Sequence, residues 1–247
     1  MTKVALFLDF DGVICDSVDE CFLSSWIAYY QFYLEDSPQA VSLEEKRRFR
    51  SLRPFIRSGE DYVLIQDLIA GDHQIKNQAE FDLMVREKGA ELMDHFKELF
   101  YRAREEQIKR DRKAWLRLSK PYPGFTKRLK NIVGLSSCFI LSSKRPEFIR
   151  EILLSWDINW PLGRILYPDK REKRELIMEH LVDLKHTVGI EEAIFVEDQI
   201  DHLAKVPDRE VRCILAAWGY VVADWLDQDK YEVMSLSDFL QLIDSIS

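Results

Sequence analysis

The chain has 247 residues, 47% of them hydrophobic and 32% charged, which is long enough to bury a core and ordinary for a globular protein. Its net charge of −8 argues against nucleic-acid binding, which needs a basic surface. The first apolar run stops at Asp9, too short for a signal peptide or a membrane span, and no later run is long enough. We therefore expect a cytoplasmic protein that binds neither nucleic acid nor membrane.

The run from Val4 to Leu8 is apolar throughout, which predicts a strand buried on both faces of a parallel sheet. Asp9 and Asp11 follow it, at the end of the strand where ligands bind in open α/β sheets. Two carboxylates one residue apart concentrate negative charge, which needs a cation or a proton. The alternative is a pair of solvated turn aspartates, with Gly12 for the bend.

The next hundred residues are predicted to be all helical. Apolar residues recur at three- and four-residue steps between Val18 and Tyr33. Ser42 and Glu45 have the spacing of a capping box, which predicts a helix start. Asn77 is expected to begin one long helix that runs to between Trp115 and Leu118.

A basic stretch from Lys46 to Arg57 lies within this region. A solvated helix face would explain most of it. Arg53 precedes Pro54, which biases its backbone away from the helix, and Arg57 precedes another break. Because arginine binds anionic groups through two parallel hydrogen bonds, we predict that Arg53 or Arg57 faces the Asp9 site and binds a second negative group of a substrate.

Lys120–Gly124 contains two prolines and a glycine and is predicted to be a linker. Short apolar runs then alternate with helical patterns, which predicts a parallel sheet with helices on both faces. We expect five strands with the first in the middle. The later strands are expected at Ser136–Leu141, Arg164–Tyr167, Ala193–Val196 and Val211–Ala216, and the helices at Phe125–Ile132, Pro146–Trp156, Glu172–Lys185, Ile200–Lys205 and Asp238–Ile246.

Four short motifs occur in order along these elements. They are Asp9 with Asp11, then Ser142 after a predicted strand, then Lys173, then the acidic group Glu197-Asp198-Gln199-Ile200-Asp201. In order and position they resemble the motifs of phosphatases of the haloacid dehalogenase (HAD) superfamily. The resemblance implies a Rossmann-like α/β core of residues 1–16 and 118–247, with an all-helical C1-type cap, residues 17–117, inserted after the first strand.

The resemblance also implies a role for each motif. Asp9 would be the nucleophile that forms an aspartyl phosphate, and Asp11 would protonate the leaving oxygen and later deprotonate water. Ser142, Ser143 and Lys173 would bind the phosphoryl oxygens. Ser142 could instead be an ordinary turn residue, Lys170 competes with Lys173, and Lys144 is a less favoured substitute.

Mg²⁺ is the cofactor implied by the family, held by Asp9, Asp198 and the Asp11 backbone carbonyl. The fourth motif departs from the family pattern, because Glu197 replaces a glycine and His202 stands where a second acid is usual. Glu197 or Asp201 could supply that acid, directly or through water, or neither could, with weaker metal binding as the consequence. We interpret His202 as a surface helix residue.

Trp218-Gly219-Tyr220 resembles a turn of phosphoglycolate-phosphatase-like members, and we interpret it as a packing feature. The function expected from the resemblance is Mg²⁺-dependent hydrolysis of a small phosphorylated metabolite. A phosphomutase of the same superfamily and a non-catalytic binding protein with the same fold are the alternatives. Asp11 argues against a dehalogenase, which needs no leaving-group acid there.

Overall fold

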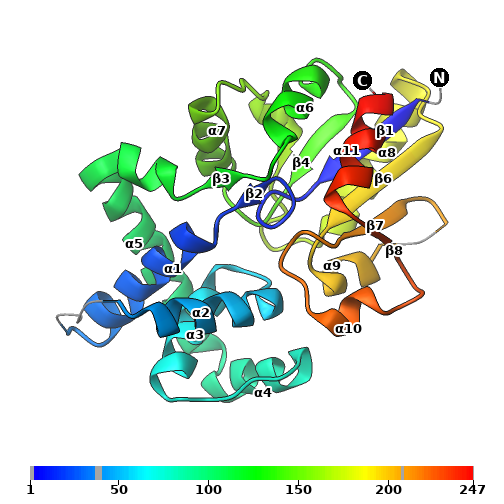
Figure 1. Ribbon diagram of the computed structural model, residues 1–247. Helices are drawn as coiled ribbons and strands as arrows, with labels where there is room; N and C mark the ends of the chain where they lie inside the picture. The colour runs from blue at the N-terminus through cyan, green and yellow to red at the C-terminus, as the bar shows by residue number, and fades with distance from the viewer. Residues whose placement is uncertain (1–2, 37–40, 207–208, 247) are drawn as a thin grey trace. The chain divides into compact units, whose positions relative to one another are not determined.

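The computed structural model describes residues 3–36, 41–206 and 209–246. The chain forms two compact units: an α/β unit of Met1–Asp16 with Lys120–Ser247, and a helical unit of Ser17–Ser119 (Figure 1). No helix in the described ranges is long and apolar enough to cross a bilayer.

The α/β unit is built on one parallel sheet of six strands in the order β5-β4-β1-β6-β7-β8. The strands are β1 (Val4–Leu8), β4 (Cys138–Leu141), β5 (Ile165–Leu166), β6 (Glu192–Glu197), β7 (Arg212–Ala216) and β8 (Glu232–Met234). The predicted α/β fold is confirmed, but the predicted count of five strands is wrong. The strand β8 was not predicted from the sequence because it has no apolar run. It is short, lies at the sheet edge and buries one of its three residues.

The position of β1 explains its sequence. It pairs with β4 on one side and β6 on the other, and the side chains from Ala5 to Leu8 are fully buried. Such a strand needs apolar residues on both faces. Asp9 continues the ladder by donating its backbone N–H to the carbonyl of Val196 at 3.0 Å. The first carboxylate is therefore held at the carboxyl edge of the sheet by its backbone.

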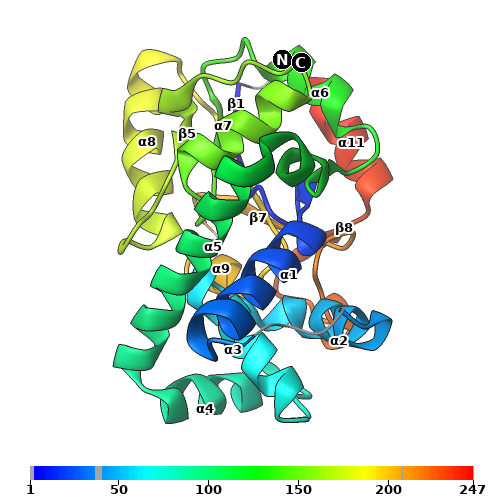
Figure 2. The ribbon, with the colours of Figure 1, turned by 90° about the vertical axis from the view of Figure 1, so that its left-hand side faces the viewer.

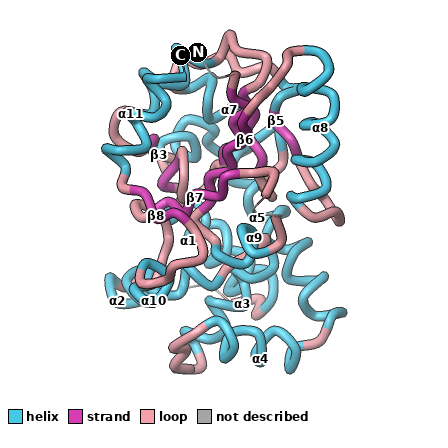
Figure 3. Tube along the Cα trace, turned by 90° about the vertical axis from the view of Figure 1, so that its right-hand side faces the viewer, coloured by secondary structure: helices cyan, strands magenta, loops and turns pink. Residues whose placement is uncertain are grey.

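Helices cover both faces of the sheet. Figures 2 and 3 show α8 and α11 on opposite sides of the strands. Phe125 of α6 packs on Phe239 of α11 with ring centroids 6.1 Å apart, so these two helices share one layer. The helices of this unit are α6 (Phe125–Ile132), α7 (Pro146–Ser155), α8 (Lys173–Thr187), α9 (Ile200–Ala204), α10 (Ala223–Leu226) and α11 (Leu236–Ile246).

The chain passes between the units twice, and the two passages pair with each other. Strand β2 (Cys15–Asp16) pairs antiparallel with β3 (Lys120–Pro121). The segment Lys120–Gly124, predicted to be a linker, does begin where the chain leaves the helical unit, but its first two residues form a strand. A two-residue edge pair tolerates the proline that made this segment look like a loop.

The helical unit contains seven helical segments in the described residues. The predicted capping box is confirmed: the Ser42 hydroxyl accepts from the Glu45 N–H at 3.1 Å, and the Glu45 carboxylate accepts from the Ser42 N–H at 2.8 Å. The segments are α1 (Val18–Ile27), the π-helix η1 (Ala28–Tyr33), α2 (Leu43–Leu52), the 3-10 helix η2 (Arg53–Phe55), α3 (Gly59–Ala70), α4 (Gln78–Lys88) and α5 (Ala90–Arg117).

The single long helix predicted from Asn77 is wrong. Gly89 separates α4 from α5 with a backbone φ of +78°, a left-handed value that glycine adopts without strain. The apolar spacing misled the prediction because Phe81 of α4 and Met93 and Phe96 of α5 are all buried, although they belong to two helices. Periodicity reports which residues are buried, not whether the backbone is continuous.

A buried ion pair ties α1 to α5 inside the helical unit. Arg104 donates to both carboxylate oxygens of Glu20 at 2.8 Å, and Trp115 and Ser24 donate to the same carboxylate at 3.1 and 2.8 Å. Both charged side chains are almost completely buried. A buried charge costs several kcal/mol unless it is paired and hydrogen-bonded, as Glu20 is here.

We expect an Arg104→Met variant to lose about 3–5 kcal/mol of unfolding free energy, because the Glu20 carboxylate would stay buried without its cation. Chemical denaturation measures this loss. Arg102→Met, on the exposed side of the same helix, is the matched control and should cost at most about 1 kcal/mol. Equal losses from the two variants would contradict the interpretation.

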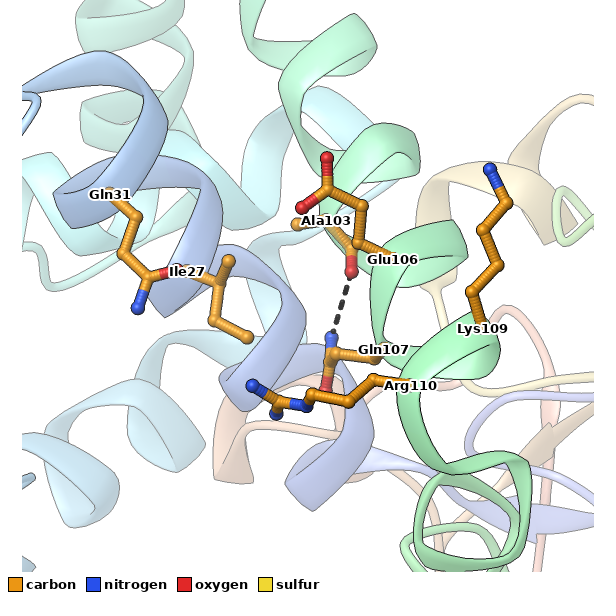
Figure 4. A pocket seen from close by; sticks show the side chains of 7 residues that line it. All are labelled: Ile27, Gln31, Ala103, Glu106, Gln107, Lys109 and Arg110. Atoms are coloured by element: carbon orange, nitrogen blue, oxygen red, sulfur yellow. Dashed lines mark hydrogen bonds between the residues drawn. The ribbon is translucent and has the colours of Figure 1, made fainter.

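The helical unit also carries a surface groove of about 410 Å³ (Figure 4). In it the Gln107 side chain donates to the Ala103 carbonyl at 3.3 Å. The groove is lined by Ile27, Gln31, Ala103, Glu106, Gln107, Lys109 and Arg110. These residues do not include any site residue predicted from the sequence, so the candidate site lies elsewhere.

Candidate active site

Three acidic side chains meet at the carboxyl edge of the sheet. Asp9 follows β1, Glu197 ends β6, and Asp198 comes next in the chain. One oxygen of each carboxylate lies within 4.8 Å of the others, and all three side chains are buried. The two strands are neighbours, so their ends meet at one place although Asp9 and Glu197 are far apart in sequence.

Lys173 bridges two of these acids. Its Nζ lies 2.7 Å from Asp9 Oδ1 and 2.5 Å from Glu197 Oε2, and its side chain is buried. It is the first residue of α8, where Glu172 and Glu175 form a capping box. Lys170, the competing lysine, is exposed. The structure thus places Lys173 against the proposed nucleophile.

The pKa values follow from this burial and pairing. Burial and the charge of Glu197 raise the pKa of Asp9 to about 6, against the opposing effect of Lys173. Burial works against ionisation of Glu197 too, but Lys173 and His202 hold its pKa well below the ordinary value. Burial opposes the charge on Lys173, yet its two carboxylate partners raise its pKa. Lys173 therefore keeps its positive charge, and of Asp9, Glu197 and Lys173 it is Asp9 whose pKa lies near neutral pH.

Both carboxylate oxygens of Glu197 have hydrogen-bond partners. Oε1 accepts from the backbone N–H groups of Asp198 and Gln199 at 3.1 and 3.2 Å. Oε2 lies 3.1 Å from His202 Nδ1 as well as close to Lys173. His202 is a helix residue with a side chain 20% exposed, as expected, but its contact with Glu197 makes the interpretation as a surface residue incomplete. The helix α9 is one short turn, and it brings residue 202 back over residue 197, which helical periodicity could not reveal.

Asp201 has a different position. Its backbone N–H donates to the Gln199 side chain at 2.8 Å, at the start of α9. The buried acidic group in the described part of the chain comprises Asp9, Glu197 and Asp198. Of the two acids proposed for the fourth motif, Glu197 is the one that joins this group.

The turn Trp218-Gly219-Tyr220 contacts the site, so its interpretation as packing alone is incomplete. Trp218 stacks on Phe239, with centroids 5.3 Å apart, but the Tyr220 N–H donates to Asp198 Oδ2 at 2.8 Å. A Cβ atom at Gly219 would lie 2.5 Å from the Cβ of Asp198. The turn needs glycine because the backbone runs against this carboxylate. In the sequence, Gly219 was the one indication that this turn approaches another group closely.

Gly12 lies against the same carboxylate from the other side. Its φ is +95°, and a Cβ atom there would lie 1.8 Å from Asp198 Oδ2. Position 12 therefore needs glycine for two reasons: the backbone bends there, and any side chain would collide with Asp198. Two backbone segments enclose Asp198 and hold it beside Asp9.

Asp11 has its own cation. Its Oδ1 lies 3.0 Å from the Nζ of Lys144, a buried lysine in the loop after β4. Ser142 is buried at the end of β4 and accepts from the Lys144 N–H at 3.4 Å, whereas Ser143 is partly exposed. Lys144 was the less favoured lysine in the sequence, because nothing in a linear pattern shows that it reaches Asp11.

The two arginines predicted to bind substrate have partners in the helical unit. Arg57 donates to both oxygens of Asp82, at 2.6 and 3.2 Å. Arg53 is buried, with its guanidinium 5.2 Å from the centre of the Tyr62 ring. Its backbone is helical (φ −54°, ψ −35°) and begins η2, so the expected bias from Pro54 is wrong. A substrate contact for either arginine stays a prediction.

Comparison with known proteins adds information on the fold. No protein-family model matches the chain, and no curated protein matches it. Solved structures do match. A predicted phosphoglycolate phosphatase from Haemophilus somnus 129PT is 13% identical, with 96% of each chain covered and a TM-score of 0.59. A predicted phosphatase from Clostridium acetobutylicum is 14% identical, with 99% of each chain covered and a TM-score of 0.53.

A haloacid dehalogenase-like family hydrolase from Streptococcus pneumoniae is 13% identical over 100% of this chain and 99% of its own, with a TM-score of 0.53. These identities are low, so the likeness concerns the fold. The chain has the haloacid dehalogenase-like fold, and the expectation from the four motifs is confirmed at this level.

Proposed function

We propose that this protein is a Mg²⁺-dependent phosphatase that hydrolyses a small phosphorylated metabolite through an aspartyl phosphate on Asp9. The observation that carries the proposal is the buried group of Asp9, Lys173, Glu197 and Asp198 at the carboxyl edge of a haloacid dehalogenase-like sheet. A buried carboxylate with a lysine on one side and further acids on the other is suited to accept a phosphoryl group and a cation together.

The donor atoms fit a hard divalent cation. Oxygen ligands from carboxylates are what Mg²⁺ prefers, and three such oxygens converge here. This group of three carboxylates contains one ammonium group, that of Lys173, which leaves two negative charges in the set. Asp9, Asp198 and Glu197, with the Asp11 backbone carbonyl, would hold the ion. When bound, it would neutralise the charge that otherwise keeps a phosphate away from Asp9.

The chain's own residues supply the covalent steps. A carboxylate oxygen of Asp9 attacks phosphorus, and the bond from phosphorus to the leaving oxygen breaks. Asp11 gives its proton to that oxygen. In the second step Asp11 takes a proton from water, the water oxygen attacks phosphorus, and the bond to Asp9 breaks to release phosphate. Asp9 and Asp11 both return to their starting state.

The phosphoryl oxygens need donors as charge spreads over them. We propose the Ser142 hydroxyl, Ser143 and the Lys173 ammonium for this role, because Ser142 and Lys173 are buried at the same sheet edge as Asp9. We further propose that the helical unit acts as a cap that selects the substrate, with Arg53 and Arg57 as candidates for a second anionic group.

The test is hydrolysis of p-nitrophenyl phosphate and of a panel of phosphorylated metabolites, with Mg²⁺ and with a chelator. We expect hydrolysis that needs Mg²⁺ and one preferred metabolite class. If Mg²⁺ binds but no ester is cleaved, the protein is a binding module. If a sugar phosphate is converted to its isomer without net release of phosphate, the protein is a phosphomutase.

A further inference from the structure

Lys144 and Asp11 form a second buried ion pair at the site. The Nζ–Oδ1 distance is 3.0 Å, and the side chains are 2% and 12% exposed. Asp11 comes from the loop after β1 and Lys144 from the loop after β4, and these strands are neighbours in the sheet. The pair therefore joins two loops at the edge where Asp9 lies.

The ammonium group of Lys144 also lies near an aromatic ring. Its Nζ lies 5.8 Å from the centre of the Phe10 ring, and Phe10 stacks on Trp156 with centroids 6.1 Å apart and planes 13° apart. Burying an ammonium group is costly unless a carboxylate compensates for it. A lysine placed in this way is poorly explained as a solvated surface charge.

The two buried lysines serve different carboxylates. Lys173 contacts Asp9 and Glu197, whereas Lys144 contacts Asp11. We infer that Lys144 is a positioning residue, which holds the Asp11 carboxylate where it can exchange a proton with the leaving oxygen. This inference rests on the proposed phosphatase function.

The ion pair assigns the two oxygens of Asp11 different tasks. Because Oδ1 lies 3.0 Å from the ammonium group, we assign the proton transferred in the proposed reaction to Oδ2. That proton moves to the leaving oxygen as its bond to phosphorus breaks, and Lys144 keeps all its protons throughout. Since 1 Å of misplacement of a catalytic group can cost about 100-fold in rate, a carboxylate released from Lys144 should transfer its proton less well.

The diagnostic measurement is kcat/KM for two esters of different leaving group. In a double displacement, kcat/KM reports only the steps up to departure of the leaving group. An alkyl ester such as β-glycerophosphate needs the acid, whereas p-nitrophenolate leaves readily without one. We expect Lys144→Met to lower kcat/KM for the alkyl ester about 10- to 100-fold more than for p-nitrophenyl phosphate.

Three comparisons make the test specific. Lys170→Met removes an exposed lysine of the same unit and should leave kcat/KM unchanged for both esters. Lys144→Arg keeps the charge and should restore part of the alkyl-ester activity. In the Asp11→Asn background, Lys144→Met should lower kcat/KM for the alkyl ester little further, because the carboxylate that Lys144 positions is already absent.

Each other outcome overturns the inference. Equal losses for both esters would mean that Lys144 binds the phosphoryl group directly. A lower melting temperature with an unchanged ratio of the two kcat/KM values would mean that the ion pair is structural only. A wild-type protein that hydrolyses neither these esters nor any member of the metabolite panel would refute the proposed phosphatase function itself, which is a different result from failure of this inference.

Discussion

An Asp9→Asn variant is expected to stay folded and to lose turnover by about 10⁴-fold or more, the scale on which enzymes respond to loss of a nucleophile. The amide has nearly the shape of the carboxylate but does not attack phosphorus. Steady-state hydrolysis of the best substrate, with Mg²⁺ present, measures the loss.

The fold should tolerate this change because Asp9 is not needed for stability. Lys173 keeps its contact with Glu197 at 2.5 Å when Asp9 is neutral. Removing a like charge beside Glu197 also relieves repulsion. Asp183→Asn, on the exposed side of α8, is the matched control and should leave activity unchanged. A folded Asp9→Asn protein with substantial activity would refute the nucleophile assignment.

The covalent intermediate provides an independent readout for the same prediction. Acid quenching of the wild-type protein during turnover should add the mass of one phosphoryl group to the peptide that contains Asp9. The Asp9→Asn variant should show no such adduct. A phosphorylated peptide elsewhere in the chain would contradict the assignment even if the variant were inactive.

Removing Asp198 is expected to have the second largest effect. In the wild type, Mg²⁺ should raise the melting temperature, because the ion binds the folded site and neutralises its excess charge. Asp198→Asn should abolish this shift and lower activity more than about 100-fold. Without metal the variant should be at least as stable as the wild type, because three converging carboxylates become two.

The Mg²⁺ effect should also depend on pH through Asp9. The pKa of Asp9 is about 6 in the folded protein, above its ordinary value of 3.8. Without metal the folded state therefore binds more protons than the unfolded chain, and its unfolding free energy falls as pH rises through this interval. Mg²⁺ competes with that proton. The Mg²⁺-induced rise in melting temperature should therefore grow between about pH 5 and about pH 7. A rise of constant size, or one retained in Asp198→Asn, would place the metal elsewhere.

Features that depend on local pattern could be predicted from the order of residues. The apolar run at Val4–Leu8 predicts a doubly buried strand, because such a strand has no solvated face. The alternation that follows Phe125 predicts the parallel α/β sheet, and the order of the four motifs predicts which strand ends carry polar residues. These inferences hold because buried positions are apolar and recur along the sequence with the period of the helix or strand.

Which side chains contact each other could be seen only in three dimensions. Nothing in the spacing of Lys144, His202 or Tyr220 indicates that they contact Asp11, Glu197 and Asp198, because each contact joins loops of different strands or closes a very short helix. The break at Gly89 was also hidden, because both helices bury the same kind of residue. Charge pairing depends on three-dimensional distance and desolvation, and neither can be calculated from the order of residues alone.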